Sequence, residues 1–397
     1  MKKMYKVAHF KGLEIMKKSF YFVVLYFLEI LNVCGVLILS TSCQNKSKKS
    51  DTLQNNVFNF IHSENSKPST LTLQKSTTNI TAMDTFMTIQ IYGDKKNTDI
   101  ANQKAKEEIL RIEKLLSVTD SESEIFMLNH HQNEWLDVNQ TTWEILLESK
   151  KMAQLTKGAF NPCLYPVLSA WGFTTGSFSV PDNQTIQNLM QFTDFEKMDF
   201  EDSCRVFLSQ NMMIDLGGIA KGFTGDKIIQ ILKKNGIESA LLDFGGNIQT
   251  LGTKPDGSKW NIGIKNPLTG EVAAGIKVEN LAVITSGGYE RFFTTSDGKK
   301  YIHIIDSKTG FPVDNEIASV TIVAESGTYA DALSTALFVM GTEQAFNFWK
   351  KCKSEHQNAH QDFEMLIFTK NKQTFVTKGL ENKVDFIDGD FEICWWE

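Results

Sequence analysis

Closely spaced cysteines are missing from this sequence. It has six cysteines in 397 residues, and none of them forms a Cys-x-x-Cys pair. Zinc sites are usually built from such pairs, so the spacing argues against a zinc site. Two of the six, Cys34 and Cys43, fall in the N-terminal leader, and the other four lie far apart along the chain. A disulfide is permitted outside the cytoplasm, but this spacing does not require one.

A basic excess is also lacking. The formal net charge is −6, whereas proteins that bind nucleic acid usually carry a basic patch, so we expect no nucleic-acid partner. The sequence has no internal repeat and no regular alternation of strand and helix. Its 42% hydrophobic and 22% charged residues are ordinary for a globular protein. The length allows one large domain or two modest ones.

The N-terminal leader has the layout of an export signal. A lysine pair precedes an apolar run over residues 20–39, and small residues then lead to Cys43. This layout resembles a bacterial lipoprotein signal, in which the cysteine becomes the lipidated first residue. Ser40 stands where such signals usually have leucine. The sequence therefore predicts a signal peptide over 1–43 and a body anchored through Cys43 on the periplasmic side of a bacterial membrane.

Two alternatives for the leader stay open. Met16 directly precedes the lysine pair, so translation could begin there and not at Met1. The rival to a cleaved signal is an uncleaved membrane anchor, which Glu29 in the middle of the apolar run disfavours. Both interpretations place an exported, membrane-attached body behind a basic leader.

The predicted body follows a polar stretch. Residues 44–81 are rich in Asn, Ser, Lys and Thr and show little apolar periodicity, which predicts a flexible tether before a body over 82–397. Strands are expected over 83–92, 212–216, 240–244, 260–265, 275–278, 282–285, 289–294, 301–305, 319–324, 365–369 and 374–376. Helices are expected over 99–116, 141–158, 186–192, 223–234, 329–340 and 342–352, the first capped by Asp99 and the second by a Thr141–Glu144 capping box. This order predicts an α+β fold with mostly antiparallel sheets and packed helices.

Four turns with glycines and polar residues punctuate the second half. They are Asp215–Gly222, Asp243–Ile248, Thr285–Tyr289 and His303–Gly310. In the first, paired glycines let the main chain approach a ligand, the helix start offers N–H groups to a phosphate, and Lys221 adds a positive charge. Alone, this motif is better explained as a strand-to-helix turn with an exposed lysine. Four such turns at strand ends indicate a site assembled from several loops.

Asp331 and Thr335 are the most specific pair. They lie four residues apart in an expected helix, so their oxygens share one face. A carboxylate and a hydroxyl, joined by a main-chain carbonyl, suit Mg²⁺ or Ca²⁺ and not zinc. The alternative is an acidic residue favoured by the helix dipole and a threonine bonded to its own helix. His303, between two isoleucines, is either a half-buried strand residue or a general base.

Taken in order, these segments resemble the ApbE-type FAD:protein FMN transferases. The resemblance covers roughly Met83 to Thr377, and its segments are Met83-Asp84-Thr85, Gly158–Asn161, the four turns above and Ala330–Ala336. It implies an ApbE-like (T-fold-like) body whose site lies in a cleft between two lobes. It also implies a metal-dependent reaction in which FMN passes from FAD to a protein threonine and AMP leaves.

The resemblance carries roles over to individual residues. Those expected to contact FAD are Met83, Ala159, Phe160, Asn161, Asp215, Lys221 and Ile305. The metal, Mg²⁺ with Ca²⁺ as the alternative, is expected on Asp331, Thr335 and the carbonyl of Gly218. His303 matches the histidine taken to be catalytic in relatives, and Asp331 is expected to be essential through the metal. Asn161 departs from the aspartate of many relatives, and Cys163–Pro166 departs from the segment that usually follows.

Acceptor proteins of this family carry a motif resembling Asp-Gly-x-Ser/Thr-Ala/Gly-Thr. The two Asp-Gly pairs of this chain, at Asp256 and Asp297, do not complete it, so the protein is not expected to modify itself. Expected partners are exported flavoproteins such as membrane-bound redox-pump subunits. Alternative functions are an FAD pyrophosphatase, with water in place of threonine, and a non-catalytic FAD-binding lipoprotein. A generic solute-binding lipoprotein is disfavoured, because such proteins usually show repeated βαβ lobes.

Overall fold

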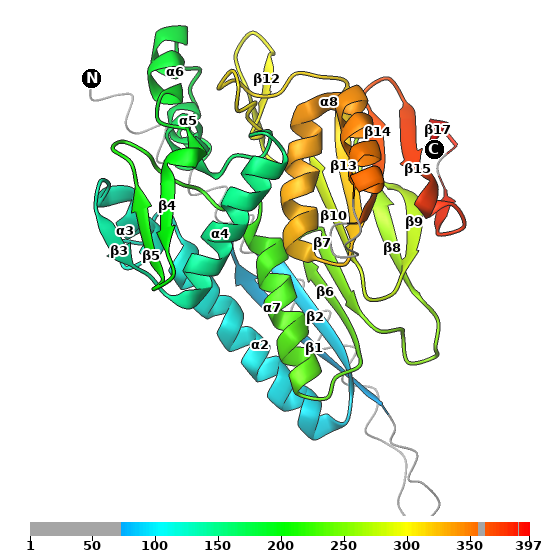
Figure 1. Cartoon of the computed structure of the whole chain (residues 1–397). Coiled ribbons are helices and arrows are strands. Elements are labelled where there is room, and N and C mark those ends of the chain that lie inside the picture. The colour runs from blue at the N-terminus through cyan, green and yellow to red at the C-terminus, as the bar shows by residue number, and fades with distance from the viewer. Residues whose placement is uncertain (1–72, 356–361, 388) are drawn as a thin grey trace, which may run out of the picture. The chain divides into compact units, whose positions relative to one another are not determined.

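A large, mostly antiparallel sheet forms the centre of the fold in the computed structural model, which describes residues 73–355, 362–387 and 389–397 (Figure 1). Its nine strands follow the order β1-β2-β6-β7-β10-β13-β14-β15-β17, and only the last pair, β15 and β17, is parallel. Their bounds are β1 Gln74–Ala82, β2 Thr85–Gly93, β6 Ser239–Phe244, β7 Asn247–Leu251, β10 Ala282–Gly287, β13 Ile317–Ala324, β14 Phe363–Thr369, β15 Gln373–Thr377 and β17 Glu392–Trp396.

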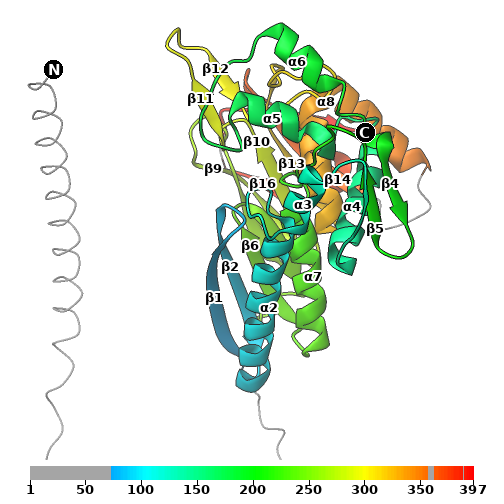
Figure 2. The same ribbon diagram turned by 90° about the vertical axis from the view of Figure 1, so that its left-hand side faces the viewer.

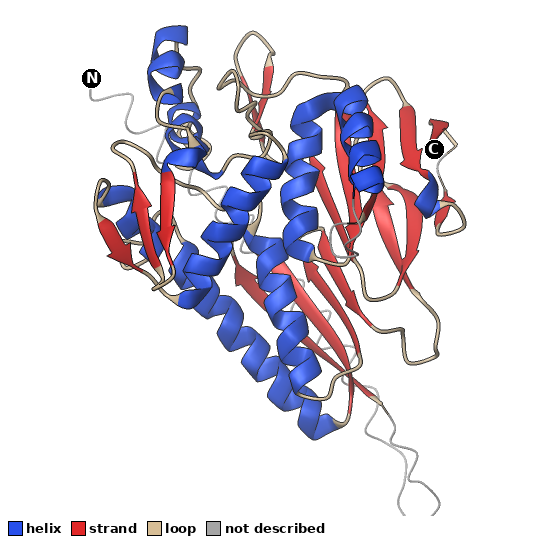
Figure 3. Cartoon of the chain, viewed as in Figure 1, coloured by secondary structure: helices blue, strands red, loops and turns tan. Residues whose placement is uncertain are grey.

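Helices cover one face of this sheet (Figures 1 and 3). The long ones are α2 Lys95–Leu116, α4 Gln140–Leu155, α7 Ala220–Lys234 and α8 Gly327–Glu355, and the short ones are α3 Glu124–His130, α5 Tyr165–Trp171 and α6 Asn183–Met190. In both views α2 and α7 run side by side, and α7 also contacts α8 (Figure 2).

Three small sheets complete the body. They are β8 Trp260–Lys265 with β9 Val272–Val278 and β16 Val384–Phe386; β3 Trp135–Asp137 with β4 Met198–Glu201 and β5 Arg205–Leu208; and the hairpin of β11 Phe292–Thr294 with β12 Lys300–Ile302. Among the described residues, no helix combines the length and apolar character needed to cross a membrane.

The period-2 pattern of the central strands explains the layers. Ile284 of β10 and Ile322 of β13 belong to the core cluster shared with the helices. Their neighbours Val283 and Val323 belong to a second cluster on the other face, together with Trp260 of β8. Successive side chains of a strand point to opposite faces, so these strands are buried on both sides. The predicted α+β fold with mostly antiparallel sheets is confirmed.

The predicted tether is wrong over its last residues. Gln74–Thr81 belong to β1, which pairs with β2 at the edge of the large sheet, so the body begins before residue 82. Polar side chains hid this strand, since one face of an edge strand stays exposed and tolerates Thr, Ser and Asn. The predicted signal peptide over 1–43, and the tether as far as residue 72, lie outside the described residues.

Two predicted helix caps are also wrong. The first long helix begins at Lys95, where the Asp94 carboxylate accepts from the N–H of Lys96, and Asp99 lies inside it. The second is capped by Asn139, whose side chain accepts from the N–H of Thr141. The N–H of Thr141, which a Thr141–Glu144 capping box would use, therefore donates to Asn139, and Glu144 pairs with Lys227 of α7. The predicted break between 340 and 342 is confirmed, because α8 is kinked at Gly341 with φ of 78°.

Candidate active site

The structure brings the three predicted metal ligands together where α7 and α8 meet. Asp331 and Thr335 lie on α8, and Gly218 lies just before α7. A Cβ added to Gly218 would lie 3.5 Å from the Thr335 hydroxyl oxygen. Asp331, only 4% exposed, accepts a hydrogen bond of 2.9 Å through Oδ2 from the N–H of Gly222.

Small residues allow α7 and α8 to approach this closely. A Cβ on Gly222 would lie 2.1 Å from the carbonyl oxygen of Gly327 and 2.8 Å from Cβ of Asp331. The buried Gln249 of β7 fills the adjoining space and donates a 2.9 Å hydrogen bond to the carbonyl of Gly222. Only glycine fits where two main chains come this close.

The donor atoms at this crossing fit a hard divalent cation. Within the described part of the chain, Oδ1 of Asp331 accepts no hydrogen bond, while Oδ2 is engaged. Among the described residues, the Thr335 hydroxyl has one hydrogen-bond partner, the hydroxyl of Ser286 at 3.4 Å, and Ser286 is itself bonded to Ser334 at 2.7 Å. One carboxylate oxygen, one hydroxyl and one main-chain carbonyl are the oxygen donors that Mg²⁺ and Ca²⁺ prefer. No group of three His, Cys, Asp or Glu side chains gathers as a metal site in the residues that the structure describes.

His303, just after β12, is held as a neutral base. Its Nδ1 lies 3.0 Å from the carbonyl oxygen of Arg291, which can only accept, so Nδ1 carries the proton. Nε2 is therefore left as an acceptor. Burial lowers the pKa of His303 to about 4, and the charges of Arg291 and Lys221 act in the same direction against the hydrogen bond. The ring can thus accept a proton at neutral pH.

The charges of Arg291 and Lys221 act on Asp215 as they do on His303. The Asp215 carboxylate accepts a 2.9 Å hydrogen bond from the N–H of Gly217. Burial raises the pKa of Asp215, and the Gly217 hydrogen bond and the charges of Arg291 and Lys221 oppose it. Lys221 itself donates only weakly, over 3.5 Å, to the carbonyl of Gly217. Its charge therefore acts on both His303 and Asp215 and is available to an anionic ligand.

The three predicted FAD contacts at residues 159–161 lie in different environments. Ala159 and Phe160 are buried, and the Phe160 ring lies 3.3 Å from the Cβ position of Gly218, next to the metal set. The Asn161 side chain is engaged within the protein, since it donates to the carbonyl of Thr193 and accepts from the N–H of Cys163.

Ile305 is set apart from the other predicted site residues. Its side chain is buried in a separate cluster with Trp171 and Phe173. The structure does not place this side chain against the metal set.

Met83 sits in a strained turn between β1 and β2. Both Met83 and Asp84 have positive φ, 51° and 57°, a conformation that costs energy for residues other than glycine. The Glu113 carboxylate of α2 accepts a 2.7 Å hydrogen bond from the N–H of Met83, and the Thr224 hydroxyl of α7 donates to its sulfur. Two helices thus hold this turn.

Two further predictions concern the strand over 212–216 and the cleft between two lobes. The segment 212–216 forms no strand, although it lies directly before Gly217 and Gly218. The expected cleft between two lobes stays a prediction. A surface hollow of about 150 Å³ lies beside α3 and β3, and none of the predicted site residues lines it.

A model of the ApbE family matches residues 83–359, more than half of the sequence. The chain belongs to the ApbE family. A "FAD:protein FMN transferase" of Klebsiella pneumoniae (strain 342) is 31% identical over 290 residues, which span 72% of this chain and 87% of that relative. One of the same name from Treponema pallidum (strain Nichols) is 32% identical over 329 residues, covering 77% and 88% respectively.

Solved structures give the same result for this ApbE-family chain. The crystal structure of the ApbE protein from Thermotoga maritima is similar with a TM-score of 0.71 and 33% identity, and it covers 78% of this chain and 99% of that one. The flavin transferase ApbE from Vibrio cholerae has a TM-score of 0.69 at 24% identity, covering 79% and 100%. At 24% identity, the similarity to the Vibrio cholerae protein shows a shared fold only.

Sequence reasoning missed several residues that position the ApbE-family site. Glu113 lies 30 residues from Met83, and Arg291 lies 12 residues from His303 across a hairpin; no local pattern marks either contact. Asp226 of α7 did leave a signal. It follows Gly222 by four residues, so the acid and the glycine share one face of the helix, and an acidic residue beside a glycine on one face indicates a close, polar helix crossing.

Proposed function

We propose that this member of the ApbE family is an FAD:protein FMN transferase that moves FMN from FAD to a threonine of an acceptor protein and releases AMP. Family membership and the names of the relatives support the reaction. The single observation that carries the metal assignment is the meeting of Gly218, Asp331 and Thr335 where α7 and α8 cross.

The chain's own residues account for the chemistry of the transfer. In the proposed reaction, the threonine oxygen forms a bond to the phosphorus on the FMN side of FAD. The bond between that phosphorus and the bridging oxygen of the pyrophosphate breaks, and the bridging oxygen leaves with AMP. His303 takes the threonine proton at Nε2, and the carbonyl of Arg291 holds the ring in the tautomer that can do so. Lys221 binds the pyrophosphate as a cation. A bound Mg²⁺ would add charge neutralisation at the pyrophosphate, which is most of what phosphoryl transfer needs.

The proposal extends to location and partners. The leader predicts a protein exported across a bacterial membrane and lipid-anchored through Cys43. The acceptors would then be exported or membrane-bound flavoproteins that carry the Asp-Gly-x-Ser/Thr-Ala/Gly-Thr motif. Oxygen donors favour Mg²⁺ as the metal, with Ca²⁺ as the alternative.

Product analysis tests the function. The protein is incubated with FAD, Mg²⁺ and an acceptor domain, and AMP, free FMN and bound FMN are quantified. The control is the same domain with its motif threonine replaced by valine. We expect AMP to form only with the threonine-bearing domain and in equal amount to bound FMN. AMP and free FMN in both reactions would identify an FAD pyrophosphatase, and unchanged FAD that stays bound would identify a carrier.

A further inference from the structure

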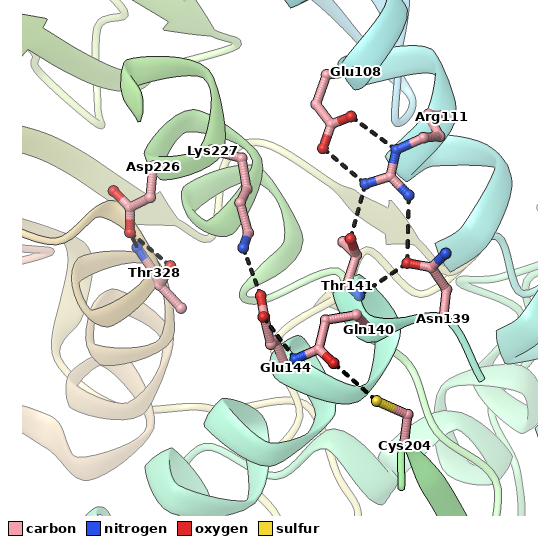
Figure 4. Close-up of polar contacts among 10 residues, drawn as sticks. All are labelled: Glu108, Arg111, Asn139, Gln140, Thr141, Glu144, Cys204, Asp226, Lys227 and Thr328. Carbon is pink, nitrogen blue, oxygen red and sulfur yellow. Dashed lines mark hydrogen bonds and ion pairs between the residues drawn. The ribbon is translucent and has the colours of Figure 1, made fainter. Parts of the chain in front are cut away.

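Two adjacent charged residues of α7 point to different neighbours (Figure 4). Asp226 reaches the first turn of α8, whereas Lys227 forms a 2.5 Å ion pair with Glu144 of α4. Helix α7, which begins at the predicted metal site, is therefore joined to α8 through Asp226 and to α4 through Lys227. The two contacts can be removed one at a time.

The Asp226 carboxylate holds the start of α8 through four hydrogen bonds. Oδ1 accepts from the N–H of Gly327 at 2.7 Å. Oδ2 accepts from the N–H and the hydroxyl of Thr328 at 2.9 and 2.7 Å, and from the hydroxyl of Ser326 at 2.9 Å. A helix start leaves its first N–H groups without partners, and here a side chain from another helix satisfies two of them.

The remaining N–H groups of this turn find their partner in Ser326, the residue directly before α8. Ser326 accepts from the N–H of Tyr329 through its hydroxyl and from the N–H of Ala330 through its carbonyl. Each N–H of the first turn is thus hydrogen-bonded. Asp226 is the partner that α7 contributes. A carboxylate beside a helix N-terminus is also favoured by the helix dipole.

This contact lies beside the hydrogen bond that joins Asp331 to α7. Asp331 follows Thr328 by three residues on α8, and its Oδ2 is bonded to Gly222 on α7. Asp226 follows Gly222 by four residues, so it lies on the same face of α7, one turn along. The Asp226 contact and the Gly222–Asp331 hydrogen bond therefore fix the crossing of the two helices at neighbouring points.

We propose that Asp226 is a positioning residue that clamps α8 to α7 and so holds Asp331 and Thr335 against the carbonyl of Gly218 for the divalent cation. This inference rests on the metal site of the proposed function. It assigns Asp226 no contact with the cation or with FAD. Groups that orient metal ligands typically change metal affinity by about 10- to 100-fold when they are removed.

Binding of Mn²⁺, used in place of Mg²⁺, tests the clamp without relying on activity. Electron paramagnetic resonance measures free Mn²⁺ in titrations of the wild-type protein and of Asp226→Asn, which keeps the shape but presents an N–H₂ group to donors. The matched control is Lys227→Met, which breaks the contact with α4 and leaves α8 untouched. Thr328→Val removes one bond of the four and keeps the test usable if Asp226→Asn does not fold.

We expect Asp226→Asn to bind Mn²⁺ about 10-fold more weakly than the wild type. Thr328→Val should weaken binding less, and Lys227→Met should not weaken it. In transfer assays, Asp226→Asn should need more Mg²⁺ for half-maximal rate and recover most of its kcat at saturating Mg²⁺.

Three results would overturn the proposal: wild-type Mn²⁺ affinity in Asp226→Asn, equal weakening in Lys227→Met, or no Mn²⁺ binding by the wild type. Mn²⁺ binding by the wild type without any FMN transfer would instead contradict the proposed function, and the variant affinities would still decide the role of Asp226.

Discussion

Replacing Gly222 with alanine would place a methyl group at the crossing of α7 and α8. The new Cβ would lie 2.1 Å from the Gly327 carbonyl oxygen and 2.8 Å from Cβ of Asp331. Ordinary contact needs about 3.5 Å, so the two helices must separate by roughly 1 Å. Such overpacking costs about 1–3 kcal/mol of folding free energy, and the better helix propensity of alanine returns up to about 1 kcal/mol. With the upper figure for each effect, the net loss is about 2 kcal/mol.

The same shift moves Asp331 relative to Gly218, and a displacement of about 1 Å in a site can cost about 100-fold in rate. We expect Gly222→Ala to unfold at lower denaturant concentration and to transfer FMN about 100-fold more slowly at a fixed Mg²⁺ concentration. Gly389→Ala is the control, because no atom of the described residues lies within 4 Å of its Cβ position, its chain neighbours aside. Wild-type rate and Mg²⁺ dependence in a destabilised Gly222→Ala protein would refute the link between helix spacing and the metal site.

Three further predictions concern the site directly. Asp331→Ala should abolish transfer because the anionic metal ligand is lost; a wild-type rate at saturating FAD and Mg²⁺, with unchanged metal content, would rule out this assignment. His303→Ala should slow transfer by about 10²- to 10⁴-fold while FAD affinity, measured by fluorescence titration, is kept; loss of FAD binding would instead give His303 a structural or stacking role. The pKa of His303, about 4 against 6.5 for an unperturbed histidine, means that the unfolded chain binds more protons between these values. Its contribution to stability is therefore complete above pH 6.5 and falls by up to about 3 kcal/mol as the pH drops to 4. A stability difference between wild type and His303→Ala that does not change over this pH window would contradict it.

The helix and strand signals of the second half predicted most of the fold. The helix that carries Asp331 and Thr335 was expected with a break before residue 342, and the structure kinks it at Gly341. The strands expected over 260–265 and 319–324 lie in β8 and β13, because alternating or continuous apolar residues mark strands buried on one or both faces.

The segment 212–216 shows why such patterns can mislead. Met212, Ile214 and Leu216 alternate and are buried, which is the pattern of a strand. The main chain at Ile214 pairs with the side-chain amide of Asn129 in place of a neighbouring strand, with bonds of 2.7 and 2.9 Å. A side chain 85 residues away substitutes for the strand ladder, and no local pattern predicts that.

Part of the candidate site could also be predicted from the sequence, and part could not. The sequence placed Asp331 and Thr335 on one helix face, which geometry alone predicts from their spacing. The contacts of Asp226 with α8, and of Glu113 with Met83, depend on how distant segments pack. Those contacts follow from the tertiary structure. The sequence could therefore name the predicted ligands, and the spacing of Gly222 and Asp226 could indicate a close helix crossing, but the partners of Asp226 and Glu113 could not be named.

The most direct test of the central claim is the intact mass of an acceptor domain after incubation with this protein, FAD and Mg²⁺, with and without a chelator. The account predicts a gain of one FMN on the motif threonine that the chelator prevents. An acceptor of unchanged mass, or one that gains FMN equally well in the chelator, would contradict metal-dependent FMN transfer.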